Sequence, residues 1–196
     1  MKIVLFGSTG KAGSRILKEL TARGHQVTTF TRQQDDLSNV DTIAAHIAGA
    51  DAVVSAYAPP PDNTDALVDV TKGLIAAVKK SGNARLIVVG GAGSLEVAPG
   101  VSLLASGHLP KEWVPIAASH EKALEALRAS DINWTYFSPA SFFEPGARTG
   151  KFRLGTNNLV TDEKGDSRIS MEDYAIALVD ELEQPAHQRA QFSIGY

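Results

Sequence analysis

Three glycines near the start of the chain have the type and spacing to bind a phosphate group. Gly7, Gly10 and Gly13 form G-x-x-G-x-x-G directly after the apolar residues 2–6 and open a segment with helical periodicity. Glycines permit a tight turn and close approach to a pyrophosphate, and the start of a helix offers free N–H groups to that anion. We therefore expect dinucleotide binding through Gly7, Ser8, Thr9, Gly10, Lys11, Ala12 and Gly13.

A P-loop and an ordinary turn are the two other possible interpretations of this loop. A P-loop requires four residues between its first glycine and Gly-Lys, followed by Ser or Thr. Here only Ser8 and Thr9 separate Gly7 from Gly10, and Ala12 follows the lysine, so the P-loop is excluded. An ordinary turn between a strand and a helix remains as the alternative without a ligand.

The end of the second expected strand, residues 26–31, predicts which dinucleotide is bound. A chain that binds NAD usually carries an acid there, which contacts the ribose 2′-hydroxyl. This sequence has Thr31 followed by Arg32, whose planar guanidinium can hold a 2′-phosphate with help from Lys11. We therefore expect NADP(H) to be preferred over NAD(H). The alternative is that Arg32 is a solvated arginine paired with nearby acids.

The remaining sequence predicts the sheet that such a loop needs, because short apolar runs alternate with amphipathic helices. We expect a single α/β domain over 1–196, an NAD(P)-binding Rossmann domain with a doubly wound, mostly parallel sheet and a small substrate-side region at about 139–170. The expected strands are 2–6, 26–31, 52–56, 86–89, 134–137 and 191–194, with short ones near 152–154 and 159–160. The expected helices start near 11, 40, 67 and 117, and after Ser170, which with Asp173 resembles a capping box.

The connection after the second strand is unusually short. A full Rossmann half places a helix, a third strand and another helix there. Only residues 32–50 are available, and one helix at 40–47 uses most of them. We therefore expect the third strand to be shortened or missing, which leaves the second strand at or near the sheet edge.

Composition excludes several function classes. The 196 residues are 43% hydrophobic and 21% charged with a net charge of −3, so nothing indicates a nucleic-acid partner. The absence of cysteine excludes disulfides and thiolate sites, and the five histidines show no metal-ligand spacing, so we expect no metal. The first apolar run is too short for a signal or membrane span. We expect a cytoplasmic monomer or homodimer with no membrane contact.

Three later stretches carry a resemblance to a known family. They are residues 89–95 (VGGAGSL), 134–140 (WTYFSPA) and a longer stretch over 143–183 that contains FEPG and ISMEDYA. With the glycine loop, they make the chain resemble the atypical short-chain dehydrogenases/reductases, especially the NADH-flavin reductase group related to biliverdin reductase B. The resemblance covers essentially the whole chain and implies a bound nicotinamide dinucleotide more securely than it implies a flavin substrate.

The resemblance also implies further cofactor contacts. It places Asp36 near the adenine, although the short connection weakens this assignment. Ligands collect at the carboxyl ends of strands in such sheets, and simple turn geometry is the alternative for the small residues there. The residues implied at these strand ends are Ser55, Ala56 and Tyr57, then Gly90 and Gly91, then Ser138, Pro139 and Ala140, the last three beside the nicotinamide.

The sequence departs from the family at one chemical position. Many relatives use Tyr-x-x-x-Lys, in which the tyrosine protonates a carbonyl oxygen. The pattern aligns here on Lys122, but Ala118 stands four residues before it. Lys122 either touches the nicotinamide ribose or is an exposed lysine. Ser94 is the candidate catalytic residue, with a plain loop hydroxyl as its alternative, and we interpret His120 as a surface or packing residue.

The missing tyrosine separates the possible functions. Ketone reduction needs a proton donor near the developing alkoxide, whereas a flavin or quinone delocalises charge and demands less of the protein. We expect an NAD(P)H-dependent oxidoreductase that transfers hydride to a small-molecule acceptor such as a flavin or quinone. A non-catalytic NADP(H)-sensing regulator of the NmrA-like type is the alternative. A sugar-nucleotide epimerase is disfavoured by the missing tyrosine and the small C-terminal region.

Overall fold

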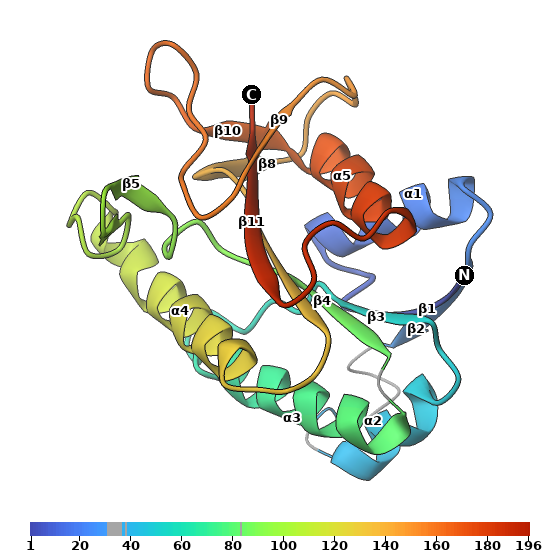
Figure 1. The fold of residues 1–196 in the computed structure, drawn as a ribbon. Helices are drawn as coiled ribbons and strands as arrows, with labels where there is room; N and C mark the ends of the chain where they lie inside the picture. Colours follow the sequence, from blue (N-terminus) through green and yellow to red (C-terminus); the bar gives the residue numbers. More distant parts are fainter. Residues whose placement is uncertain (31–36, 38, 83) are drawn as a thin grey trace.

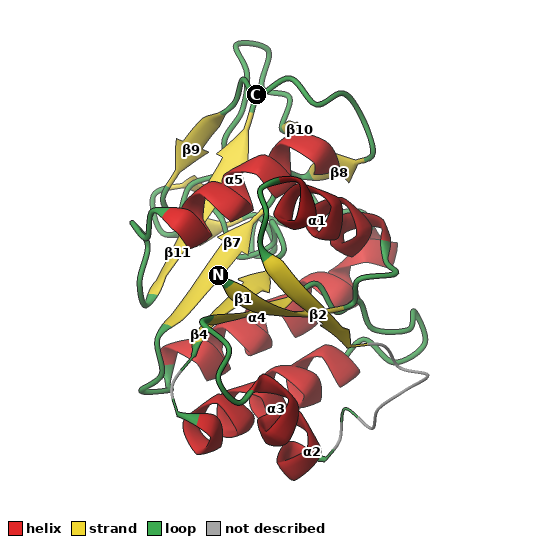
Figure 2. Cartoon of the chain, turned by 90° about the vertical axis from the view of Figure 1, so that its right-hand side faces the viewer, coloured by secondary structure: helices red, strands yellow, loops and turns green. Residues whose placement is uncertain are grey.

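A seven-stranded sheet lies between two layers of helices (Figures 1 and 2). The computed structural model describes residues 1–30, 37, 39–82 and 84–196. Helices α1 and α5 cover one face of the sheet, and α2, α3 and α4 cover the other. The helices are α1 (Lys11–Ala22), α2 (Val40–Ile47), α3 (Ala66–Ser81), α4 (Val114–Arg128) and α5 (Met171–Glu183). The strands of this sheet are β1 (Lys2–Phe6), β2 (Gln26–Phe30), β3 (Ala52–Ser55), β4 (Arg85–Val89), β7 (Trp134–Ser138), β9 (Arg153–Gly155) and β11 (Ala190–Gly195).

The strand order confirms the doubly wound, mostly parallel sheet. It runs β2-β1-β3-β4-β7-β11-β9, and only β9 is antiparallel to its neighbour. Among the described residues β2 pairs with β1 alone, so β2 forms the edge. The expected loss of the third strand therefore holds for the described part of the connection to α2.

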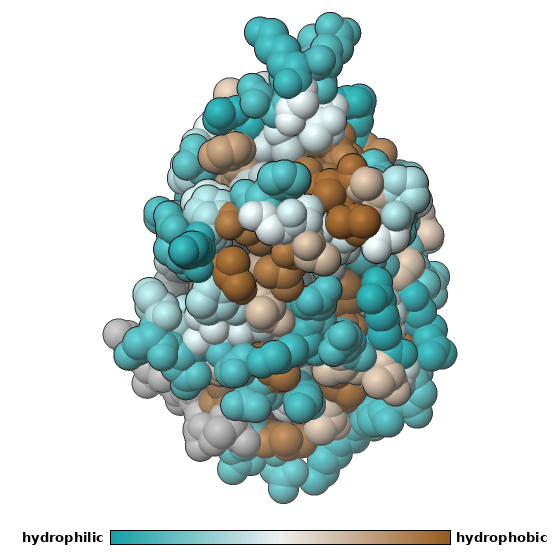
Figure 3. Space-filling model, turned by 90° about the vertical axis from the view of Figure 1, so that its left-hand side faces the viewer, coloured by the Kyte–Doolittle hydropathy of each residue, from teal (hydrophilic) through white to brown (hydrophobic). Residues whose placement is uncertain are grey.

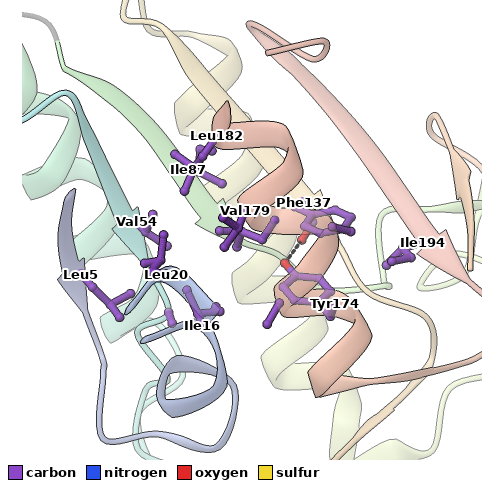
Figure 4. Packing of buried hydrophobic residues seen from close by; sticks show 14 of the residues in the cluster. Leu5, Ile16, Leu20, Val54, Ile87, Phe137, Tyr174, Val179, Leu182 and Ile194 are labelled. Atoms are coloured by element: carbon purple, nitrogen blue, oxygen red, sulfur yellow. Dashed lines mark hydrogen bonds between the residues drawn. The ribbon is translucent and has the colours of Figure 1, made fainter. Parts of the chain in front are cut away.

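The sheet is buried on both faces because its strands are apolar at successive positions. In β1, Ile3 and Leu5 belong to the core beneath α1 and α5, while Val4 and Phe6 belong to the core beneath α2, α3 and α4. Figure 4 shows the first core, where side chains of β1, β3, β4 and β7 meet those of α1 and α5. Both faces thus hold the strand ends rigidly in register.

The structure adds elements that the sequence analysis did not predict. A parallel pair lies beside the main sheet, formed by β8 (Phe142–Glu144) and β10 (Arg168–Ser170). The loop after β4 contains a hairpin of β5 (Glu96–Ala98) and β6 (Val101–Ser102). Helix α4 begins at Val114, before the expected residue 117, because Pro115 fits the first turn of a helix. A 3-10 turn, η1 (Lys111–Trp113), precedes it.

Two details of the C-terminal third differ from expectation. No strand forms at 159–160, where Leu159 N–H only donates to the carbonyl of Glu96 at 2.9 Å. Ser170 caps α5 as expected and accepts from Asp173 N–H at 3.0 Å. The Asp173 carboxylate does not complete the capping box, because it instead accepts from Thr149 N–H at 2.7 Å and Gly150 N–H at 2.8 Å. It therefore ties residues 149–150 to α5.

A buried ion pair lies at the amino ends of β4 and β7. Arg85 pairs with the Glu181 carboxylate of α5 and donates to Thr135 Oγ1 at 2.7 Å. His187 Nδ1 lies 2.7 Å from the other Glu181 oxygen. Burial alone would raise the pKa of Glu181, but hydrogen bonds from His187 and Arg85 lower it. Glu181 thus stays ionised and holds α5 against the sheet.

Candidate functional site

The glycine turn after β1 is built by close backbone packing. Gly7 has φ of +79°, and a Cβ there would lie 2.3 Å from the carbonyl oxygen of Ala56. A Cβ on Gly13 would lie 2.0 Å from the carbonyl oxygen of Gly7. Gly10 N–H donates to that same oxygen at 3.0 Å. Side chains at 7 and 13 are therefore excluded, and the first turn of α1 rests directly on the end of β1.

The start of α1 is free to receive an anion. Its N-cap is Gly10, which has no capping side chain, and the first turn carries no acid. The earliest helical hydrogen bond runs from Ser14 N–H to the carbonyl of Gly10 at 2.9 Å. The preceding N–H groups of Lys11, Ala12 and Gly13 have no partner within the helix. Their positive end, beside the exposed Lys11, fits a pyrophosphate.

The strand register brings three other predicted segments to the same edge. Ala56 N–H donates to the carbonyl of Phe6 at 2.9 Å, and Gly90 N–H donates to the carbonyl of Phe137 at 2.8 Å. Ser55 pairs with Phe6 on one side and with Val88 on the other. The carboxyl edge of the sheet thus carries Ser55, Ala56, Tyr57, Gly90, Gly91, Ser138, Pro139 and Ala140 beside the glycine turn.

A tyrosine and a histidine shape the corner between β4 and α4. The Tyr136 hydroxyl accepts from Gly91 N–H and donates to the carbonyl of His120, each at 3.1 Å, and lies 3.0 Å from His120 Nδ1. A Cβ on Gly90 would lie 2.4 Å from the Tyr136 ring, and one on Gly91 would lie 2.9 Å from the His120 ring. These two glycines are required because aromatic rings occupy the space.

Both side chains of this corner are uncharged at neutral pH. Burial lowers the pKa of His120 to about 4, and burial raises the pKa of the Tyr136 phenol. His120 therefore packs against Tyr136 and Gly91, in agreement with its interpretation as a packing residue. Its position two residues before Lys122 turns the two side chains to different faces of α4.

Lys122 lies on the side of α4 that faces the start of α3. Its ammonium is 3.0 Å from the Asp65 carboxylate, and the Ser119 hydroxyl donates to the same oxygen at 2.9 Å. Both charged side chains are exposed. The pKa of Asp65 is lowered by the hydrogen bond from Lys122 and then by that from Ser119. A role of Lys122 at the nicotinamide ribose stays a prediction.

Ser94 lies in the loop that follows β4. It is half-buried, and its hydroxyl oxygen accepts from Gln191 Nε2 of β11 at 2.8 Å. The same amide nitrogen donates to the hydroxyl oxygen of Ser138 at 3.0 Å. The structure thus joins the candidate catalytic residue to the predicted cofactor edge through Gln191, which the sequence analysis did not single out. Thr31, Arg32 and Asp36 lie outside the described residues.

The face in front of this edge combines polar and apolar groups. Figure 3 shows apolar side chains gathered in the middle of the face that carries β5 and the start of α4. The Trp113 and Phe142 rings meet edge to face, with centroids 6.4 Å apart. The large apolar side chains exposed on β5, β6 and β8 and around the start of α4 are Val97, Val101, Trp113, Val114 and Phe142. Such a face suits a flat organic molecule better than a charged one.

The segment that follows β8 is tied to both α1 and α5. Glu172 of α5 accepts from Arg15 Nε of α1 at 2.6 Å and from Gly146 N–H at 2.7 Å. Arg148 donates to the Glu19 carboxylate of α1 at 2.9 Å.

Within the described residues, no helix is both long enough and apolar enough to span a membrane.

Comparison with known proteins places these features in a family. Residues 7–185 match the NAD(P)H-binding family. The chain is 41% identical to the protein YwnB of Bacillus subtilis (strain 168), across 99% of this chain and 98% of that one. A Bacteroides thetaiotaomicron protein, provisionally named an epimerase, is 42% identical with a TM-score of 0.92, covering 100% of this chain and 96% of that one. A Streptococcus pneumoniae TIGR4 protein, provisionally named an NADH-flavin reductase, is 34% identical with a TM-score of 0.91, covering 100% and 99%.

Proposed function

The chain belongs to the NAD(P)H-binding family, among the atypical short-chain dehydrogenases/reductases, and we propose that it is an NAD(P)H-dependent reductase of conjugated acceptors such as flavins and quinones. The observation that carries the proposal is the uncapped, acid-free start of α1 behind Gly7, at the same sheet edge as Gly90 and Ser138. The name of the pneumococcal relative supports a flavin acceptor, and the exposed apolar side chains around Trp113 and Phe142 support a planar one.

Each segment of this edge has a proposed task. The N–H groups at the start of α1 and the Lys11 ammonium bind the pyrophosphate. The segments that end β4 and β7, at Gly90, Gly91 and Ser138, border the nicotinamide. The bound dinucleotide supplies a hydride. The Ser94 hydroxyl donates a hydrogen bond to the acceptor atom that gains negative charge, and water supplies the proton.

The test is the rate of NADPH oxidation with FMN and, separately, with a benzoquinone, each against the rate without protein. We expect the protein to accelerate at least one of these reactions. Tight NADPH binding without acceleration of either reaction would contradict the proposal and favour the NmrA-like sensing role, to which the alanine at position 118 also points.

We propose that Arg32 sets a preference for NADPH over NADH. A hydrogen bond to a charged group contributes about 1.5–3 kcal/mol, and the lower half of that range is roughly tenfold to thirtyfold in affinity. Arg32→Ala should weaken NADPH binding by this factor and leave NADH binding unchanged. The measurement is the Kd of each cofactor, by quenching of protein fluorescence, for both proteins. Equal wild-type affinities for NADPH and NADH, or a variant that loses affinity for both alike, would contradict the proposal that Arg32 selects NADPH.

A further inference from the structure

The amide of Gln191 lies at the centre of a polar cluster next to the proposed acceptor site. Its oxygen accepts from Arg128 Nη2 of α4 at 3.1 Å. Its nitrogen donates to Ser94 Oγ at 2.8 Å and to Ser138 Oγ at 3.0 Å. The cluster joins the loop after β4, the end of β7, the start of β11 and the last turn of α4.

The chemistry of Arg128 fixes which way this amide points. A guanidinium can only donate hydrogen bonds, so it requires the amide oxygen on its side. The amide nitrogen must then face the two serines, and its two hydrogens serve one serine each. Because both hydroxyl oxygens accept from Gln191, each serine keeps its own O–H free to donate elsewhere.

Only the Ser94 O–H is accessible to a ligand at the carboxyl edge. Ser138 is fully buried at the last residue of β7, and Ser94 is half-buried in the loop that follows Gly90 and Gly91. Neither hydroxyl is seen to donate to another group in the described part of the chain, although each has an oxygen that is already engaged. Hydrogen-bond donors that are held in place before the reaction stabilise charge that develops during it.

We propose that Gln191, oriented by Arg128 and held by the buried Ser138, is a positioning residue that turns the Ser94 hydroxyl toward the acceptor as a hydrogen-bond donor. This rests on the proposed reductase function. It selects acceptors in which a conjugated carbonyl oxygen or ring nitrogen gains negative charge when the hydride arrives. The acceptor gains a hydride from the reduced nicotinamide, which is oxidised, and a proton from water, while Ser94 remains protonated.

The direct test is Gln191→Glu, which replaces the amide nitrogen with an oxygen of similar size. A carboxylate only accepts, and the nearby Arg128 keeps it ionised, so both serines must turn their O–H groups toward it. Losing one preorganised donor typically costs about a hundredfold to a thousandfold in kcat. We expect kcat with FMN or benzoquinone to fall by at least about tenfold, because the Ser94 donor is turned away and not removed. The Kd for NADPH should not change.

Gln188→Glu is the matched control. Gln188 is exposed near the start of β11, and its oxygen accepts from Asn133 Nδ2 at 3.3 Å, which a carboxylate also does. This variant should keep the wild-type kcat. The same Gln191→Glu change in a Ser94→Ala background should lower kcat by a much smaller factor than in the wild type, because the hydroxyl through which Gln191 acts is already absent.

The outcomes separate this inference from the function on which it rests. A wild-type protein that reduces no acceptor overturns both. An active wild type with an unaffected Gln191→Glu variant, or with additive effects in the Ser94→Ala background, overturns the positioning role alone. If Gln191→Glu does not fold, Arg128→Met tests the positioning role instead, because it removes the hydrogen bond that orients the Gln191 amide. It should lower kcat by a smaller factor and leave NADPH binding unchanged, and an unchanged kcat would again overturn the role.

Discussion

At their carboxyl ends the central strands lead into glycine, serine and alanine, whereas at their amino ends β4 and β7 hold the buried Arg85 and Thr135 against Glu181. Among the described residues, the carboxyl edge leaves the first N–H groups of α1 and the Ser94 O–H available to a ligand. At the amino edge, both oxygens of the Glu181 carboxylate accept hydrogen bonds from the protein itself. The difference shows how one sheet divides its ends between binding and stability. Substitutions at the two edges should therefore have different consequences.

The largest effect is expected at the amino edge. Glu181→Gln leaves the Arg85 charge buried without its counterion, and breaking a buried ion pair from one side costs about 3–5 kcal/mol. We expect the free energy of unfolding to fall by about 3 kcal/mol, the low end, because the glutamine oxygen still accepts one hydrogen bond. Urea titration measures it. The neighbouring Asp180→Asn, at an exposed ion pair with Arg23, should cost at most about 1 kcal/mol.

The NADPH affinity of the folded Glu181→Gln protein should match that of the wild type. A large loss of affinity would mean that the two edges are not independent.

A smaller effect is expected at the glycine turn. A methyl group on Gly13 would collide with the Gly7 carbonyl oxygen, and overpacking of this kind costs about 1–3 kcal/mol. Gly13→Ala should therefore weaken NADPH binding by roughly tenfold to a hundredfold, because the turn must open. Fluorescence titration gives the Kd. Gly73→Ala, inside α3 with 3.7 Å to the nearest atom, should leave the Kd unchanged and stabilise the helix. An unaltered Kd for NADPH in Gly13→Ala would show that the glycine turn is not part of the cofactor site.

The pH dependence of stability should involve both edges. Burial would raise the pKa of Asp173, but hydrogen bonds from Thr149, Gly150 and Tyr196 lower it below its ordinary 3.8, as those to Glu181 lower that pKa below 4.5. Groups with a lowered folded pKa stabilise the protein above their unfolded pKa, and this is lost as pH falls through the folded value. The free energy of unfolding should therefore decline below about pH 4.5, and less steeply in Asp173→Asn. An equal slope in that variant would refute the assignment to Asp173.

The smallest effect is expected from Tyr136→Phe. The phenol is fully buried and its hydroxyl is bonded to Gly91 and His120, so it cannot reach an acceptor as an acid. We expect a stability loss of about 1 kcal/mol and a kcat close to that of the wild type. The same expectation holds for Tyr57→Phe and Tyr174→Phe. A fall in kcat of about a hundredfold or more in any of the three would identify a general acid and revive carbonyl reduction.

The sequence predicted the parts of this molecule that depend on local pattern. The glycine spacing, the apolar runs of β1 and β3, and the short connection after β2 are each readable within a window of a few residues. The pairing of β8 with β10 joins residues far apart in the chain, and neither segment carries a strand pattern of its own. The same holds for the carboxylate of Asp173, which binds a loop instead of the helix start because tertiary contacts supply better partners.

The candidate site divides along the same line. Gly7, Gly10 and Gly13 were predicted because a phosphate turn has a sequence signature, and Ser55, Gly90 and Ser138 because strand ends in parallel sheets converge. Gln191 has no such signature. Its importance arises only when β11 lies beside β7, which places its amide between two serines and an arginine.

The two tryptophans give each edge its own optical signal. Trp134 begins β7 at the amino edge and is buried, whereas Trp113 is 42% exposed before α4 and meets Phe142 beside the carboxyl edge. Indole emission shifts to shorter wavelengths in apolar surroundings, so the two side chains emit in different parts of the spectrum. A molecule that binds beside Trp113 and Phe142 should alter the long-wavelength part of the emission spectrum. Loosening of the structure around Arg85 should alter the short-wavelength part. The native chain can thus report ligand entry and unfolding in one spectrum, without an added dye.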